Sequence, residues 1–337
     1  MRALCRKIIN FFRLSFLPPK DLNWGYPLFV MAVGLGTMYL CRRLVTILPF
    51  SPTSLIFASL FMPLTVLISL IIPAVSLASA DKRLSSAGFA GKYTGLGPIL
   101  IAFFSGVPLG LFNTACHNLS AYLWLRLGRS MAFPAFMCYN LDGSLISVIL
   151  EILTQSVIPA IGISIFFAGV MWSLFRDENK GIGSVIIIIA FVLYQLNPVD
   201  TIGLIAAGWW ILTLRKKAGN IYAPFFALTA MKITQVSFSF ILPYLDTTTL
   251  QTYSDIPSAI FYSSIPSIFV ALILFSFFKS TLDDFERVYN SDLLGRENTE
   301  DRKAVREDRP LPLSSGFNIA LASAVVIMLV LWGFLLF

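Results

Sequence analysis

The chain has 337 residues, of which 57% are hydrophobic and only 13% are charged. Soluble domains carry about 25% charged residues, so this composition excludes an ordinary soluble enzyme and indicates an integral membrane protein. The net charge of +7 is small, and its acidic and basic residues are mixed, which predicts solvated loops and no nucleic-acid partner.

Residues 1–26 form a basic, amphipathic arm in which Arg6, Lys7 and Arg13 stand among aliphatic and aromatic residues. The arm lacks the pattern of a cleavable signal peptide. A helix that lies in the surface of the membrane fits this composition better. We therefore expect the arm to lie on the cytoplasmic face.

Apolar runs follow one another along the rest of the chain, and most are long enough to cross a bilayer. They fall at about 27–47, 54–79, 96–125, 144–175, 182–196, 199–214, 221–243, 257–278 and 317–337. The predicted fold is an all-α, polytopic transmembrane bundle of about nine spans. Asn197-Pro198 joins the short fifth and sixth runs, which predicts a turn buried in protein. Pro159 predicts a kink in the overlong fourth run.

The organisation of the chain follows from these runs. The helical bundle would occupy 27–278, a charged cytoplasmic loop 279–316, and a last transmembrane helix 317–337. Nine of the 18 acidic residues lie between Asp283 and Asp308, within that loop. With nine crossings, five clusters of Lys and Arg fall on the same side as the N-terminus, which predicts a multi-pass cell-membrane protein with a cytoplasmic N-terminus.

Three segments within about 140–245 carry a recognisable order of residues. The first keeps Pro159, Ala160, Phe167 and Gly169 in an apolar stretch, the second reads Phe-Val-Leu-Tyr-Gln-Leu-Asn-Pro over 191–198, and the third, 208–224, joins a Gly-Trp-Trp helix, a cationic turn and Gly-Asn-Ile-Tyr-Ala-Pro. In order and spacing they resemble the motifs of the CPBP family of intramembrane proteases, which includes CAAX-processing and bacteriocin-processing proteins. The layout of the spans looks like that of the clostridial branch.

The resemblance also shows where this chain departs from the family. The paired glutamates of the first family motif correspond to Ile163 and Ser164, and its arginine corresponds to Ala168. Gln195 stands at the histidine of the second motif, and the third motif falls on Leu228 and Lys232. These residues leave no general base and no histidine partner at the family positions. The resemblance therefore implies a catalytically inactive homologue without a cofactor.

Ionisable side chains within spans are costly, so each is a candidate for function. Glu151 and Gln155 share a helix face at i and i+4, and Lys232 is expected to neutralise Glu151 or Asp200. The former active-site cavity is expected to be lined by Glu151, Gln155, Ser164, Gln195 and Lys232. It would bind a membrane segment, peptide or lipid without hydrolysis, so the expected partners are membrane lipids and a membrane-protein or peptide client.

Several polar residues keep more than one interpretation. Asp200 directly follows Pro198-Val199 and is expected to cap the sixth helix with its carboxylate. His117 and Asn113 share a face of the third run; a lone histidine predicts packing, with a polar cavity or a pH sensor as the alternative. One histidine and four scattered cysteines predict no metal site.

Two alternative functions stay open. An active endopeptidase would need a relocated base, supplied by Glu151 or by a pair of Ser164 and Lys232. A small-solute or ion transporter would use Glu151, Asp200 and Lys232 as a charge relay, although no internal repeat supports it.

Overall fold

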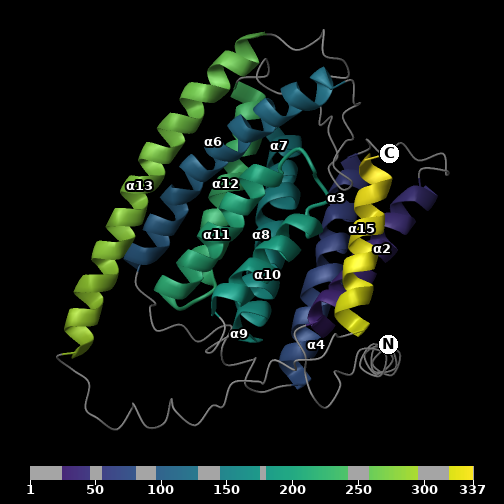
Figure 1. The fold of residues 1–337 in the computed structure, drawn as a ribbon, viewed down its shortest axis with the longest axis horizontal. Coiled ribbons are helices and arrows are strands. Elements are labelled where there is room, and N and C mark those ends of the chain that lie inside the picture. Colours follow the sequence, from purple (N-terminus) through teal and green to yellow (C-terminus); the bar gives the residue numbers. More distant parts are fainter. Residues whose placement is uncertain are drawn as a thin grey trace.

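The structure is a computed structural model, and it describes residues 25–45, 55–80, 96–127, 145–174, 180–241, 258–294 and 319–336. Nine continuous helices lie in these ranges, and each overlaps one of the apolar runs predicted from the sequence (Figure 1). Seven of them are simple: α2 (Gly25–Val45), α6 (Leu96–Arg126), α10 (Lys180–Tyr194), α11 (Thr201–Ala218), α12 (Tyr222–Ile241), α13 (Ser258–Leu294) and α15 (Ile319–Leu336). The all-α prediction is therefore confirmed for the described ranges.

Four of these helices are long and apolar enough to cross a membrane. The apolar stretches are Leu60–Ala78, Leu96–Trp124, Val148–Leu174 and Tyr262–Phe285. Three shorter apolar stretches add to them: Gly25–Cys41, Gly181–Tyr194 and Leu321–Gly333. These helices indicate a multi-pass membrane protein, whereas the crossing count of nine stays a prediction.

Two helices are composite, because turns of π-helix interrupt them. The first runs through α3 (Leu55–Val66), η1 (Leu67–Ile71) and α4 (Ile72–Ala80), and the second through α7 (Leu145–Glu151), η2 (Ile152–Val157), α8 (Ile158–Ile163), η3 (Ser164–Met171) and α9 (Trp172–Leu174). Pro159, which has no backbone N–H to donate, lies between η2 and η3. The predicted disturbance at Pro159 is thus a change of helix type. Such wide turns are frequent at functional sites.

Helices α6 and α12 pack closely because two glycines on α6 face the backbone of α12. A Cβ atom at Gly106 would lie 2.3 Å from the carbonyl oxygen of Ala227, and one at Gly110 would lie 2.7 Å from that of Met231. Small residues four apart let membrane helices approach in this way. The contact fixes the position of α12, and with it that of Lys232.

Helix α13 lies along the outer side of α6 and continues to Leu294, so the first part of the predicted charged loop is helical (Figure 1). Leu282 is buried, and the ring of Phe285 lies 3.0 Å from the Cβ position of Gly97 on α6. Lys217, at the end of α11, forms an ion pair with Asp283. These contacts explain why residues 279–294 are helical although their many charges predicted a solvated loop. Residues 295–316 of the predicted loop and 1–24 of the predicted arm lie outside the described ranges.

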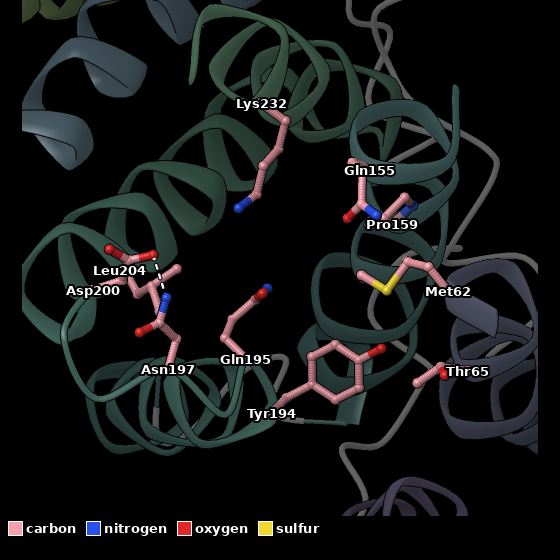
Figure 2. Close-up of a pocket in the computed structure, with 10 residues that line it drawn as sticks. All are labelled: Met62, Thr65, Gln155, Pro159, Tyr194, Gln195, Asn197, Asp200, Leu204 and Lys232. Carbon is pink, nitrogen blue, oxygen red and sulfur yellow. Dashed lines mark hydrogen bonds between the residues drawn. The ribbon is translucent and has the colours of Figure 1, made fainter. Parts of the chain in front are cut away.

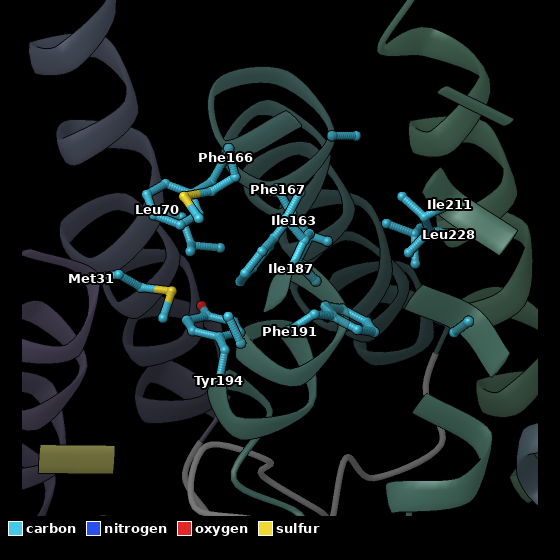
Figure 3. Close-up of a cluster of buried hydrophobic side chains, with 14 of the residues drawn as sticks. Met31, Leu70, Ile163, Phe166, Phe167, Ile187, Phe191, Tyr194, Ile211 and Leu228 are labelled. Carbon is cyan, nitrogen blue, oxygen red and sulfur yellow. The ribbon is translucent and has the colours of Figure 1, made fainter. Parts of the chain in front are cut away.

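The centre of the bundle is a close-packed apolar core to which η1, η3, α10, α11 and α12 all contribute (Figure 3). Phe167 and Phe191 meet edge to face, with ring centroids 5.7 Å apart and an interplanar angle of 79°. Trp210 is fully buried, and its indole N–H donates to the hydroxyl of Ser105 at 2.8 Å. Aromatic pairs in such geometry contribute about 0.5–1.5 kcal/mol beyond the area that they bury.

Candidate functional site: a polar cavity around Lys232

The turn between α10 and α11 is buried, as Asn197-Pro198 predicted. Leu196 adopts a left-handed backbone conformation with φ of 47°. The side chain of Asn197 stabilises the turn by accepting the backbone N–H of Val199 at 3.2 Å. A helix of the length of α10 rises about 22 Å, which is less than the roughly 30 Å of a hydrocarbon core. We therefore expect this turn to lie within the depth of the membrane.

Asp200 ends this turn, and its carboxylate connects two elements. Nδ1 of His117, on α6, lies 2.5 Å from Oδ1 of Asp200, and the side-chain amide of Asn197 donates to Oδ2 at 2.7 Å. The prediction that this carboxylate caps α11 is wrong, because it makes no side-chain cap bond. The backbone carbonyl of Asp200 instead accepts the N–H of Leu204 at 2.9 Å. The partners of the carboxylate come from the neighbouring helix and the turn.

Beside this carboxylate lies a polar cavity enclosed by α3, η2, α8, α10, α11 and α12 (Figure 2). Ten residues line it: Met62, Thr65, Gln155, Pro159, Tyr194, Gln195, Asn197, Asp200, Leu204 and Lys232. Its volume of about 30 Å³ holds about two water molecules, at roughly 10–15 Å³ of accessible volume for each. The cavity therefore fits a small polar group and is too small for a whole peptide.

Lys232 extends from α12 into this cavity (Figure 2). The residue is only 8% exposed, and its ammonium makes no hydrogen bond or ion pair with any described residue. The expected ion pair between Lys232 and Asp200 is therefore not formed, although both residues line the cavity. The side chain of Glu151, the other expected partner, lies outside the described part. A buried charge without a partner is costly, so an occupant that pairs with it would be strongly favoured.

Two amide atoms add to the unpaired polarity of the cavity. Nε2 of Gln195 and Oε1 of Gln155 are buried and have no partner among the described residues. At the edge of the cavity the hydroxyl groups of Tyr194 and Ser69 lie 3.3 Å apart, and Ser69 donates to the carbonyl of Thr65 at 2.5 Å. The cavity thus offers an ammonium and an amide donor together with an amide acceptor.

The residues that the resemblance aligns with the CPBP motifs lie in two places, the cavity and the apolar core, except Ser164, which belongs to neither. Gln195 and Lys232 line the cavity, together with the predicted Gln155. The others, Ile163, Ala168 and Leu228, belong to the apolar core, which Figure 3 shows for Ile163 and Leu228.

Two of the residues predicted to line the cavity are absent from its described lining. Ser164 is 1% exposed, its hydroxyl has no partner among the described residues, and it does not line the cavity. Glu151 ends α7, and its side chain lies outside the described part.

One further contact was missed by sequence reasoning. Arg215, near the end of α11, is 6% exposed, and its Nε–H donates to the carbonyl of Ala168 at 2.8 Å. Its Nη1 also donates to the carbonyl of Gly219. A positively charged residue in a cationic turn predicts a solvated side chain, yet this guanidinium joins η3 to the end of α11.

Sequence reasoning also missed the role of Tyr194 and Asn197 in the cavity and the pair of His117 with Asp200. The polar face of α6 that holds Asn113 and His117 indicated a polar contact there, but the sequence could not show that Asp200 is the partner of His117. Among the described residues, no three His, Cys, Asp or Glu side chains form a group that could hold a metal ion. Comparison of the chain with protein-family models, curated proteins and solved structures finds no match.

Proposed function

We propose that this protein binds a membrane client through the cavity around Lys232 and does not hydrolyse it. The observation that carries the proposal is the buried ammonium of Lys232, which has no hydrogen bond or ion pair with any described residue. It lies beside amide atoms of Gln155 and Gln195 that also lack described partners. A buried ionisable side chain inside a membrane protein is energetically costly, which makes it a candidate for function. Because the cavity is small, only a polar group of the client enters it, while the rest of the client lies against the bundle.

The apolar core supports the absence of hydrolysis by the route used in CPBP proteases. Activation of water by that route needs a carboxylate and a histidine at the family positions. Ile163 and Leu228, which stand at two of these positions, are 2% and 1% exposed and belong to the apolar core. The order of the three sequence motifs supports descent from this family, with nine crossings and a cytoplasmic N-terminus as part of the same proposal.

A transporter of a small solute or ion is the second candidate. It is favoured by the pair of His117 and Asp200 next to the cavity, because a proton-binding pair beside a buried cation is typical of ion-coupled pathways. Uptake of a solute into sealed liposomes that contain the protein would support this candidate. Binding without uptake would support the client-binding function.

The test uses the full-length protein in liposomes with a pool of membrane-anchored peptides, including CAAX-type peptides. We expect no cleavage and the retention of some peptides by the wild type, with loss of retention in Lys232→Met. Leu228→Met, one turn away in the core, is the matched control and should retain the peptides. Cleavage that is lost in Lys232→Met or Asp200→Asn would overturn the proposal, and so would the absence of retention by folded protein.

A further inference from the structure

The cavity around Lys232 has the donors, the charge and the size of a site for one carboxylate group. The ammonium of Lys232 and Nε2 of Gln195 are two donors without partners among the described residues, and both residues line the same small space (Figure 2). A carboxylate offers two acceptor oxygens, and hydrogen bonds between ionised groups and such donors are about twice as strong as neutral ones. The cavity volume of about 30 Å³ accommodates that group and little more.

The carboxylate already present in the lining does not take this place. Asp200 is held by His117 at 2.5 Å and by Asn197 at 2.7 Å, and it forms no ion pair with Lys232. Its own hydrogen bonds direct it toward α6 and the turn. The ammonium consequently lacks a close anion among the described residues, which is the deficit that a ligand carboxylate would fill.

The charges around the cavity predict that binding of a carboxylate is accompanied by the uptake of a proton. With His117 neutral and Lys232 charged, Lys232 and Asp200 sum to zero, and a ligand carboxylate would leave one uncompensated negative charge in the bundle. Protonation of His117 removes that excess. Histidine is the side chain whose unperturbed titration lies between about pH 5 and 8, so it can take up this proton near neutral pH.

The other titratable groups near His117 are few in the described part. On the helices that pack against α6, Asp200 lies at the start of α11 and Lys232 lies on α12. On α13, no titratable residue lies between Tyr262 and Lys279. On α6 itself, Cys116 precedes His117 and Tyr122 follows within two turns. Two groups can neutralise an added anion by taking up a proton: the pair of His117 with Asp200, and the amine of Lys232 if it is neutral before the anion binds. We assign the proton to the pair, and the His117→Gln variant below separates the two.

We propose that the cavity binds a carboxylate group between Lys232 and Gln195, and that the His117 and Asp200 pair takes up one proton as it binds. The proposal rests on the cavity that the proposed function uses, and it names the chemistry that the cavity recognises. Linkage is reciprocal, so binding that takes up a proton becomes tighter as the pH falls. The carboxylate can belong to a free small acid or to the C-terminus of a membrane peptide.

The experiment titrates the purified protein in nanodiscs with sodium acetate by calorimetry, at about pH 6 and about pH 8. Two buffers with different ionisation enthalpies at each pH give the number of protons taken up. We expect saturable binding that is about tenfold tighter at the lower pH, with uptake approaching one proton at the higher pH. Sodium chloride at equal concentration controls for ionic strength and for binding of any anion.

Two variants test the assigned roles. Lys232→Met should abolish acetate binding, whereas His117→Gln should keep weakened binding and lose both the proton uptake and the pH dependence. Melting curves of each variant in detergent show whether it is folded. Unchanged binding in folded Lys232→Met, or unchanged proton uptake in His117→Gln, would overturn the proposal.

A second arm separates this proposal from the proposed function. Membrane-anchored peptides with a free C-terminus are compared with the same peptides carrying a C-terminal amide. Loss of retention on amidation supports carboxylate recognition in a client. Retention of both peptide forms without acetate binding overturns the carboxylate proposal and leaves client binding intact, whereas acetate binding without retention of any peptide supports the carboxylate site and overturns client binding.

Discussion

The same three segments of the bundle build two unlike layers, one turn apart on α10 and α12 and about two turns apart on the composite helix. Leu228 and Lys232 are four residues apart on α12, and Phe191 and Gln195 are four apart on α10. Gln155 precedes Ile163 by about two turns on the composite helix. The apolar core contains Phe191, Leu228 and Ile163. The polar cavity is lined by Gln195, Lys232 and Gln155.

The two layers differ in how tightly their side chains are held in place. The core is filled by Phe167, Phe191 and their neighbours in close contact, so its residues are fixed by one another. In the described lining of the cavity, hydrogen bonds hold Asp200 to its two partners and Tyr194 to Ser69, whereas Nε2 of Gln195 and Oε1 of Gln155 have no described partner. A charge should therefore be tolerated in one layer and not in the other, and substitutions can test that difference.

The largest effect is expected from Leu228→Lys, which moves a lysine by one turn into the core. Leu228 is 1% exposed and packs among apolar side chains, so the new ammonium would have no partner. An uncompensated buried charge costs about 3–5 kcal/mol. Reversible unfolding in mixed detergent measures the loss, with Leu228→Met as the control of similar volume. Stability equal to that of the wild type would show that this layer is not a close-packed core.

The next effect is expected from Asp200→Asn, at the border between the layers. The change removes the charge that His117 faces, and a hydrogen bond to a charged group contributes about 1.5–3 kcal/mol. His117→Gln should cost a similar amount, and the double variant should cost less than the sum, because both changes remove the same contact. A double-mutant cycle by unfolding measures the coupling. Strict additivity would show that the two side chains do not stabilise each other.

The sequence predicted the helices of the described ranges well because each coincides with an apolar run, and it predicted the buried turn from Asn197-Pro198. It also indicated that Gln155, Gln195 and Lys232 are unusual within spans. It could not show that Asp200 contacts His117, since the two are 83 residues apart and an aspartate after a proline resembles a cap. The direction of Arg215 was hidden for the same reason, because its acceptor is a backbone carbonyl on another helix.

A smaller effect is expected from Tyr194→Phe, because Tyr194 belongs to both layers. Its ring lies 6.0 Å from that of Phe167 in the core, and its hydroxyl meets Ser69 at the edge of the cavity. The variant keeps the ring and loses one hydrogen bond, which is a loss of about 0.5–1.5 kcal/mol. Unfolding measures the change, and Tyr222→Phe on the exposed start of α12 should leave stability unaltered. A loss of several kcal/mol would mean that the hydroxyl organises the whole cavity.

The smallest effect on stability is expected from Lys232→Met, although its effect on binding is the largest. Lys232 has no described partner to lose, and methionine keeps a long, flexible chain while it removes a buried charge. Replacement of buried ionised groups by apolar ones of similar size is often neutral or stabilising. Melting in detergent should therefore stay unchanged or rise, in contrast to Leu228→Lys on the same helix. A marked drop in the melting temperature would mean that the ammonium stabilises the bundle itself. Both layers would then contribute to stability, although their residues differ in polarity.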